Sequence, residues 1–386
     1  MSSSVVVGPR GAERAERGHP WIYQSDITEI RARGGDVVEV FAPRGRKLGE
    51  ALYSDRSQIA LRLLTRGEER FDAAKLADRL DAALAFRERL GIDATAYRLV
   101  HGEADRLPSL IVDRYGGVLV VQALSQGMDR LLGDVVSVLG KRLTPAGILT
   151  RHDANARALE GLPQTIEVLR GTVPPTVAVR DRDLEYEVDP YHGQKTGLFL
   201  DQRENRWAAA AYAGGRALDC FSYDGGFSFA LARPSTEVVA VEVSEQAAAR
   251  LATNANRNRL ANVRTVTGNV FDVLRDMERR GERFGTIVLD PPAFAKTRAS
   301  LPRALGAYKE INLRALKILD PGGTLVSCSC SYHVSEPLFL DVVQAAARDA
   351  RATLSLLEKR TQARDHPVLL GVPETNYLKC LLLRKL

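Results

Sequence analysis

The first stretch of the chain, residues 1–70, carries short apolar runs separated by Gly, Pro, Asp and Ser. The runs are VVEVF at 37–41, LGEALY at 48–53 and IALRLL at 59–64. Runs of this length, bounded by turn-forming residues, predict short β-strands. We therefore expect a small β-rich module at the start of the chain.

The pattern changes at Asp72, where Leu and Ala begin to recur at spacings of three and four residues. This periodicity predicts a helix that ends at Gly91. Two apolar runs that meet at Tyr115–Gly117 predict a pair of strands. Later patterns predict a helix at 128–141 and strands near 146–150 and 183–188. Residues 71–188 are therefore expected to form a second region that contains both helices and strands.

Strand and helix patterns alternate regularly from residue 189 to residue 386. The strand-like runs are ALDCF, VVAVEV, VRTVTG, TIVLDPP, TLVSCSC, LSLLEKR and NYLKCLLLR. Strands that are apolar on both faces need helices packed on each face of their sheet. The alternation therefore predicts an α/β fold with a mostly parallel sheet between two helix layers. Ligands of such sheets bind at the carboxyl ends of the strands. The chemistry of this region is therefore sought just after those runs.

The composition and charge of the chain narrow the classes of protein to which it can belong. The chain is 45% hydrophobic and 26% charged, which is typical of a globular protein. No apolar run approaches the ~20 residues of a membrane helix, and the N-terminus lacks the pattern of a signal peptide. We expect a cytoplasmic protein without membrane contact. The net charge of +6 is compatible with a polyanionic partner but does not require one.

Acidic side chains follow the first two strands of the α/β region. Asp219 ends the first strand, and Gly225–Gly226 then open a helix, which allows a ligand to approach the backbone closely. The turn is not G-x-G-x-x-G, and Tyr223–Asp224 add bulk and negative charge, so a pyrophosphate is disfavoured. Glu242 ends the next strand, near the ~20-residue spacing at which an acid meets ribose hydroxyls. S-adenosylmethionine fits these features, although a helix cap and a surface charge are the plain alternatives.

The fourth strand of this region ends in TIVLDPPAFAK. Proline cannot continue a central strand, so Pro291–Pro292 predict a rigid loop directly after Asp290. Asp290 is then placed to hydrogen-bond the polar edge of a substrate, and Phe294 to stack on a ring.

A basic run follows this loop. Between residues 293 and 317, Lys296, Arg298, Arg303, Lys309, Arg314 and Lys317 face a single acid, Glu310. Phosphate contact and a solvated helix face are about equally good explanations of such a run.

Four cysteines, at 220, 328, 330 and 380, do not suggest a disulfide framework, so free thiols are expected. Cys330 is nearer than Cys328 to the carboxyl end of its strand, where substrate would bind. A metal site is not expected, because no cysteine pair has ligand spacing and His333 is the nearest partner. A buried structural role is the usual one for a single cysteine.

Several of these segments resemble one known family. In chain order they are HGQKTGLFLDQREN, LDCFSYDGGFS, LDPPAFAK, SCSCS, DHPV and NYLK. They resemble the class I methyltransferase domain of the RlmI-type large-subunit ribosomal RNA 5-methylcytosine methyltransferases. RGHPWIY and SQIALRLL resemble the PUA RNA-binding module of that family, and YRLVHGEADRLPSLIVDRYGG resembles its central domain. The resemblance implies a PUA-like domain at 1–70, a central α+β domain at 71–188 and a Rossmann-like, seven-stranded methyltransferase domain at 189–386.

The resemblance also implies S-adenosylmethionine as the methyl donor and a set of residues that hold it. These are Gln194, Lys195, Thr196, Phe199, Asp201, Arg203, Asp219, Phe221, Ser222, Gly225, Gly226, Glu242, Ser244, Asn269, Asp290 and Pro291. Asn269 departs from the family, whose members often have Asp there, but an amide oxygen can still accept from an adenine amino group. Phe294, Lys296 and Arg298 are expected to contact RNA.

The same resemblance places the nucleophile at Cys330, with Asp290 as its catalytic partner. Cytosine C5 is a poor nucleophile, and a thiolate that adds to C6 makes C5 reactive toward a methyl donor. The expected activity is C5 methylation of a cytosine in large-subunit (23S) ribosomal RNA, with the base for the C5 proton unidentified. Two rivals remain, an exocyclic amino methyltransferase and a catalytically silent RNA-binding assembly factor. A homodimer is left open.

Overall fold

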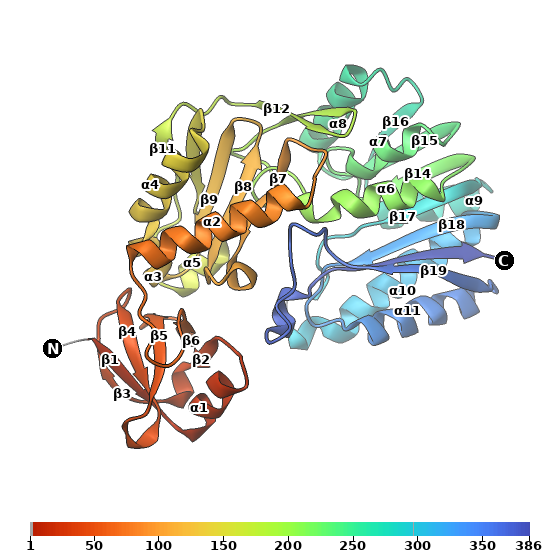
Figure 1. Cartoon of the computed structure of the whole chain (residues 1–386). Coiled ribbons are helices and arrows are strands. Elements are labelled where there is room, and N and C mark those ends of the chain that lie inside the picture. The colour runs from red at the N-terminus through yellow and green to blue at the C-terminus, as the bar shows by residue number, and fades with distance from the viewer. Residues whose placement is uncertain (1–2, 296) are drawn as a thin grey trace. The chain divides into compact units, whose positions relative to one another are not determined.

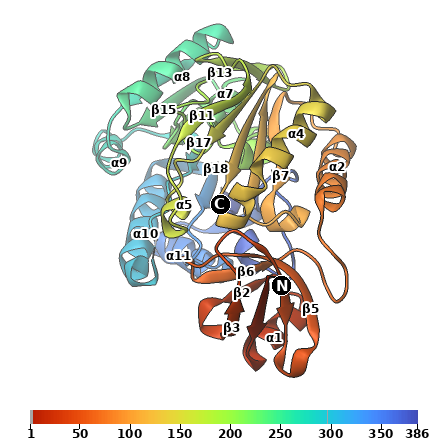
Figure 2. The ribbon, with the colours of Figure 1, turned by 90° about the vertical axis from the view of Figure 1, so that its left-hand side faces the viewer.

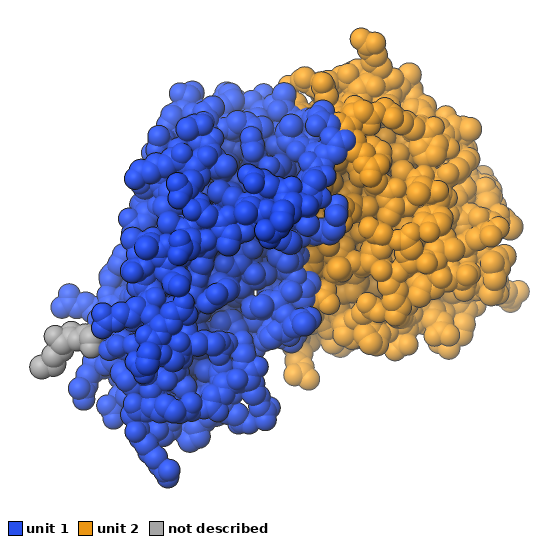
Figure 3. Space-filling view, in the orientation of Figure 1, with its two compact units in different colours: residues 1–180, 188–197, 364–375 blue, residues 181–187, 198–363, 376–386 orange. Residues whose placement is uncertain are grey.

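The computed structural model describes residues 3–295 and 297–386. They divide into two compact units, drawn in different colours in Figure 3. Unit 1 holds the chain up to Arg180 together with Val188–Gly197 and Arg364–Thr375, and unit 2 holds Asp181–Glu187, Leu198–Ala363 and Asn376–Leu386. The chain therefore passes between the units several times, and the three-domain division stays a prediction.

The start of unit 1 forms a six-stranded sheet with strand order β2-β6-β5-β4-β1-β3. The strands are β1 (Ser4–Val7), β2 (Trp21–Tyr23), β3 (Ile27–Arg31), β4 (Val37–Phe41), β5 (Lys47–Tyr53) and β6 (Ile59–Leu63). Helix α1 (Pro9–Glu16) was not expected among the predicted strands and turns. Pro9 occupies the first helical turn, and Ala12 and Ala15 are buried in the core beside the sheet. The β-rich module is confirmed, with one additional helix.

A five-stranded sheet with order β11-β10-β9-β8-β7 forms the second part of unit 1. Its strands are β7 (Ala96–His101), β8 (Leu110–Tyr115), β9 (Val118–Ala123), β10 (Gly147–Arg151) and β11 (Ile166–Gly171), and its helices are α2 (Ala73–Arg89), α3 (Gln126–Arg130), α4 (Leu132–Leu143) and α5 (Asn155–Leu159). Asp72 caps α2 by accepting a hydrogen bond from the Lys75 amide at 2.8 Å. The single helix expected at 128–141 is two helices that meet at Leu131. Strands β12 (Val177–Asp181) and β13 (Leu184–Val188) follow where the chain leaves unit 1.

Unit 2 is built on a seven-stranded sheet with order β16-β15-β14-β17-β18-β20-β19. The strands are β14 (Arg216–Cys220), β15 (Glu237–Glu242), β16 (Val263–Thr267), β17 (Phe284–Leu289), β18 (Leu319–Ser329), β19 (Leu354–Arg360) and β20 (Lys379–Lys385). Neighbours among β14 to β18 pair in parallel, whereas β20 runs antiparallel to both β18 and β19. The expected α/β fold with a mostly parallel seven-stranded sheet is confirmed.

Helices cover both faces of this sheet, as Figures 1 and 2 show. They are α6 (Arg203–Ala211), α7 (Gly226–Ala232), α8 (Glu245–Arg257), α9 (Val270–Arg279), α10 (Leu301–Ile318) and α11 (Glu336–Asp349). One core packs α9, α10 and α11 on the sheet, and a second packs α6 and α7 on the other face. Because both faces are covered, the central strands are buried along their length, which explains their continuous apolar runs.

Candidate functional site

Asp219 lies near the carboxyl end of β14 and is buried. The Ser228 hydroxyl donates to its Oδ2 atom at 2.6 Å, while Oδ1 has no hydrogen-bond partner among the described residues. Burial raises the pKa of Asp219 from 3.8 to about 7, and the charge of Asp290 adds to this shift. A buried acceptor without a partner marks a place where a ligand donor fits.

The turn after β14 has an unusual backbone conformation. Phe221 and Tyr223 have φ values of 65° and 48°, and Gly225 has φ of 90°. A Cβ atom at Gly225 would lie 2.4 Å from the Phe229 ring, so only glycine fits there. Ser222 is buried between them, and its hydroxyl has no partner among the described residues. Such strain is typical of a loop held in place for binding.

Glu242 ends β15 beside this turn. Its carboxylate accepts hydrogen bonds from the backbone amides of Tyr223 and Ser244, both at 2.9 Å. These bonds tie the turn after β14 to the turn after β15. A carboxylate has about four acceptor positions, so Glu242 can still accept from ribose hydroxyls.

Two of the expected cofactor residues cap helices. The Ser244 hydroxyl accepts from the Ala247 amide at 3.3 Å at the start of α8. The Asn269 side chain accepts from the Phe271 amide at 2.9 Å at the start of α9. Both positions follow strand ends, as expected, but each side chain already has a structural role. Their contact with a cofactor stays a prediction.

The segment from Gln194 to Arg203 passes from unit 1 to unit 2. In unit 1, Gln194 and Lys195 are exposed, whereas Thr196 is buried and donates to Asp113 at 2.6 Å.

In unit 2, the Phe199 ring meets the Tyr223 ring edge to face at 5.2 Å between centroids. The Asp201 carboxylate accepts from the Tyr377 hydroxyl at 2.7 Å, and Arg203 is buried at the start of α6. Phe199 therefore lies against the strained turn after β14.

Asp290 follows β17 directly, at the same edge of the sheet. The Gln202 side-chain amide donates to its Oδ1 atom at 2.9 Å, and Asn205 in turn donates to the Gln202 oxygen at 2.6 Å. Pro291 is buried and Pro292 is exposed, so the chain leaves the sheet here as the two prolines predict. Sequence reasoning did not single out Gln202, whose only signal is its place in the LDQREN segment.

The Phe294 ring is partly buried and contacts the rings of Phe221, Phe271 and Tyr308. These contacts give the ring a packing role, and its stacking on a substrate base stays a prediction. Lys296 lies outside the described residues, and Arg298 is exposed.

Half of the basic run at residues 293–317 is paired with acids. Lys309 pairs with Asp349 at 2.7 Å, Arg314 pairs with Glu278 at 2.7 Å, and Lys317 pairs with Glu278 at 2.8 Å. A solvated, ion-paired helix face therefore accounts for these three residues. Of the described residues of the run, Arg298 and Arg303 are exposed and stay candidates for phosphate contact.

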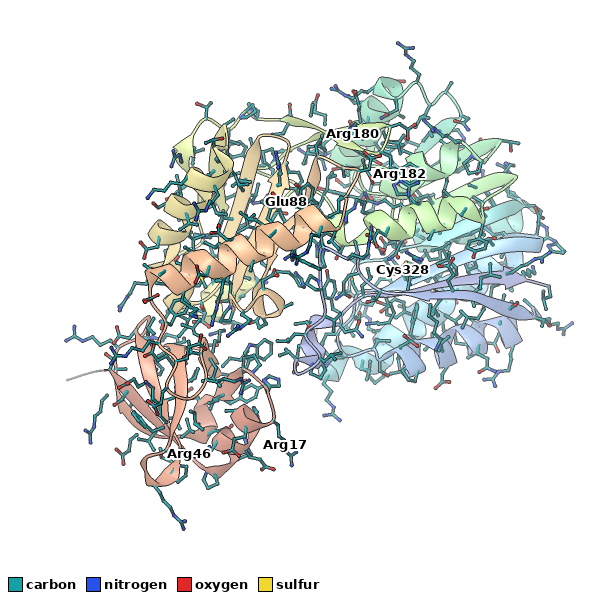
Figure 4. The ribbon with its side chains drawn as sticks, viewed as in Figure 1. Arg17, Arg46, Glu88, Arg180, Arg182 and Cys328 are labelled. Atoms are coloured by element: carbon teal, nitrogen blue, oxygen red, sulfur yellow. The ribbon has the colours of Figure 1, made fainter. Side chains whose placement is uncertain are left out.

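The two neighbouring cysteines differ in surroundings. Cys328, labelled in Figure 4, lies inside β18 opposite Cys380. Both thiols are fully buried in the core of unit 2. Burial raises the pKa of the Cys328 thiol well above its usual value. Strand β18 ends at Ser329, so Cys330 lies just beyond it and is partly exposed. Its Sγ atom lies 3.9 Å from the Pro291 carbonyl oxygen.

The backbone on both sides of Cys330 is fixed by hydroxyl groups. The buried Tyr308 hydroxyl lies 3.0 Å from the Ser329 hydroxyl and 2.9 Å from the Ser331 hydroxyl. The Ser331 hydroxyl also accepts from the Ala295 amide at 3.1 Å. The loop that carries Asp290 and the loop that carries Cys330 are thus joined by direct hydrogen bonds.

These observations fit S-adenosylmethionine as ligand of unit 2. Asp219 offers an unpartnered buried acceptor, Glu242 offers free lone pairs, and the turn at Gly225 lets a ligand approach the backbone. No phosphate-binding glycine pattern is present in the turn, which agrees with a nucleoside ligand without a diphosphate. When bound, the cofactor supplies an electrophilic methyl group.

Asp219 gives a testable prediction for the cofactor-free protein. Because its folded pKa lies above its unfolded one, the free energy of unfolding falls as pH rises from about 4 to about 7. Asn at position 219 cannot ionise, so the variant Asp219→Asn does not lose stability in this way. We expect its free energy of unfolding to exceed that of wild type at pH 8, and to exceed it by less at pH 5. One pKa unit is worth about 1.4 kcal/mol, so the gain at pH 8 is about 1 kcal/mol or more. Denaturant unfolding at both pH values measures it, and a pH-independent difference would contradict the assignment.

None of the helices in the described residues is long and apolar enough to cross a membrane. No group of three or more His, Cys, Asp or Glu side chains among these residues is arranged to hold a metal ion.

Comparison with known families agrees with this geometry. A model described as a PUA-like domain matches residues 5–66, and one described as an S-adenosylmethionine-dependent methyltransferase matches residues 98–384. The structure is similar to a chain described as a SAM-dependent methyltransferase from Streptococcus mutans, with a TM-score of 0.84, 20% identity and 99% of each chain covered. A second similar structure, SMU.776 complexed with SAH, has a TM-score of 0.85, 21% identity and the same coverage. These likenesses establish the fold.

Curated relatives are similar over the full chain. The ribosomal RNA large subunit methyltransferase I of Tolumonas auensis is 38% identical over 395 residues, covering 100% of both chains. The protein of the same name from Photobacterium profundum is 38% identical over 390 residues, covering 98% of both. With a PUA-like domain before a methyltransferase domain of matching fold, the chain belongs to the family of S-adenosylmethionine-dependent methyltransferases that contains the ribosomal RNA large subunit methyltransferases I.

Proposed function

We propose that this protein methylates C5 of a cytosine in large-subunit (23S) ribosomal RNA, through a covalent bond between Cys330 and C6 of the base. The observation that carries the proposal is the placement of Cys330. Of the four cysteines it alone is partly exposed, and it lies against the loop of Asp290 at the carboxyl edge of the sheet. The names of the curated relatives support ribosomal RNA as the substrate.

A thiol at this place explains how an unreactive carbon is methylated. The Cys330 sulfur forms a bond to C6, and the electron pair of the C5–C6 double bond becomes available at C5. C5 would then take the methyl group of bound S-adenosylmethionine, which leaves as S-adenosylhomocysteine. Loss of the C5 proton to a base and cleavage of the sulfur–C6 bond restore the aromatic ring and the free thiol. The thiol must be ionised or lose its proton as it attacks.

Asp290 acts on the opposite edge of the base in this proposal. Its carboxyl group is held by Gln202 and stands at the end of β17, one residue before the carbonyl that Cys330 contacts. A carboxyl group there hydrogen-bonds N3 and the exocyclic amine of cytosine, which stabilises the charge that develops when sulfur adds to C6. The PUA-like domain and the exposed Arg298 contact the RNA. The reaction takes place in the cytoplasm.

An RNA that carries 5-fluorocytosine at the target position tests the proposal. Fluorine at C5 cannot leave as a proton, so the sulfur–C6 bond cannot break after methyl transfer. We expect a denaturation-resistant protein–RNA complex with wild type and S-adenosylmethionine, and none with Cys330→Ala. Mass spectrometry of the digested complex locates the RNA on the peptide of Cys330.

The rival amino methyltransferase is favoured by one feature, the Asp-Pro-Pro-Ala-Phe loop after β17. That chemistry needs an aromatic ring free to stack on the base, whereas Phe294 packs against three other rings. Direct methylation of nitrogen forms no covalent complex. A methylated product at the exocyclic nitrogen, with no trapped RNA, would replace the C5 proposal.

A further inference from the structure

Lys379 is a buried lysine at the start of β20, and the residue is 7% exposed. It lies directly opposite Ser329 in the antiparallel pairing of β18 with β20. Its Nζ atom donates to the carbonyl oxygen of Ser331 at 2.7 Å and to that of Tyr377 at 2.9 Å. The ammonium group is thus held against the backbone carbonyl of Ser331, the residue that follows Cys330.

This ammonium group has no carboxylate partner among the described residues. A buried cation with only carbonyl oxygens around it is costly, because dipoles replace the lost hydration only in part. Burial accordingly lowers the pKa of Lys379 to about 8, and a negative charge on Cys330 acts in the opposite direction. A thiolate at Cys330 supplies the negative charge that the buried ammonium group of Lys379 otherwise lacks.

We propose that Lys379 is a positioning residue that stabilises the thiolate of Cys330, by holding a buried ammonium group beside the Ser329–Ser331 backbone. The inference rests on the proposed function, because it concerns the same nucleophile. Stabilisation of the thiolate lowers the pKa of the Cys330 thiol below the usual ~8.5 and so raises its reactivity at neutral pH.

Of the described residues around Cys330, Tyr308 and Asp290 do not supply a positive charge. Tyr308 on α10 donates or accepts hydrogen bonds through its hydroxyl, and burial raises its pKa, so it is neutral. Asp290, on the loop after β17, carries the opposite sign and works against a thiolate. Tyr332 and His333 follow Cys330 in the chain, with their rings 5.2 Å apart. Lys379 is therefore the group whose charge has the sign that a reactive thiolate needs.

The pH dependence of alkylation tests this inference on the full-length protein without RNA or cofactor. Iodoacetamide reacts with thiolates, and fragmentation of the shared peptide in the mass spectrometer reports the rate at Cys330 separately from that at the buried Cys328. For wild type we expect a midpoint at least one pH unit below ~8.5, the value of an ordinary thiol. In Lys379→Met the midpoint should rise by at least one unit, which slows alkylation at pH 7 about tenfold. Lys379→Arg, which keeps the charge, should restore part of the shift.

Lys385 provides a matched control on the same strand. Its Nζ atom also donates to two carbonyl oxygens, those of Leu316 and Leu319, at 2.7 and 2.6 Å. Burial lowers its pKa as well, but it lies at the other end of β20 from Cys330. Lys385→Met should leave the alkylation profile of Cys330 unchanged.

Two results would overturn the inference. One is a wild-type midpoint near ~8.5, which decides the question even if the variants fold poorly. The other is a low midpoint that Lys379→Met leaves in place. Neither result contradicts the proposed function. A different result would contradict it, namely methylation of RNA by the variant Cys330→Ala.

Discussion

Cys330→Ala is expected to lose 5-methylcytosine formation by a factor of at least about a thousand, because no other group can form the bond to C6. Binding of S-adenosylmethionine should be within a few-fold of wild type, since Cys330 is not among the residues expected to hold the cofactor. The measurement is transfer of labelled methyl groups to ribosomal RNA, with calorimetric binding of the cofactor as the check on folding. Product at the wild-type rate would end the covalent mechanism.

Cys328→Ala is the matched control for that experiment, because it removes the same sulfur atom two residues earlier. Cys328 is fully buried opposite Cys380, so its loss leaves a small cavity and lowers the free energy of unfolding by about 1 kcal/mol. Methyl transfer should be nearly unchanged at temperatures where the variant is folded. If Cys328→Ala stops turnover in a folded protein while Cys330→Ala does not, the nucleophile is the other thiol.

Asp290→Asn is expected to lower kcat by about 100- to 1,000-fold, the range seen when a group that stabilises a developing charge is removed. The amide keeps the size of the side chain and can still meet the Gln202 side chain, so the local structure should survive. It can no longer share a proton with N3 of the base. Single-turnover methylation at saturating RNA and cofactor measures the effect, and a loss confined to cofactor affinity would contradict the catalytic role.

Glu242→Gln should mainly weaken the binding of S-adenosylmethionine, whereas Asp290→Asn should mainly lower kcat. Its carboxylate lies at the end of β15 and joins the turn after β14 through the Tyr223 amide. Loss of a charged acceptor for ribose hydroxyls costs about 1.5 to 3 kcal/mol, so the Kd of S-adenosylmethionine should rise by roughly 10- to 100-fold. The rate at saturating cofactor should change much less. The two variants together separate the residue that holds the donor from the residue that acts on the base.

The sequence by itself determined the fold of unit 2 and predicted the edge of the sheet where we expect the chemistry. Continuous apolar runs require a sheet covered on both faces, and Asp219, Glu242 and Asp290 each come at the end of such a run. These features are local, because a strand, its end and the next turn are adjacent in the chain. The order of the short motifs also identified the family, which the comparisons confirm.

Only the tertiary structure decided which side chains already have partners. Cys328 lies beside Cys380 of β20 in the sheet, and both are buried in the core that α6 and α7 form on that face. Three basic residues after the Asp290 loop are neutralised by Glu278 and Asp349. The sequence does not indicate that Lys379 lies near Cys330. The structure shows it, because the pairing of β20 with β18 places Lys379 opposite Ser329. Each of these facts depends on contacts between residues far apart in the chain. Burial and charge pairing are properties of the packed sheet, so no local pattern of residues contains them.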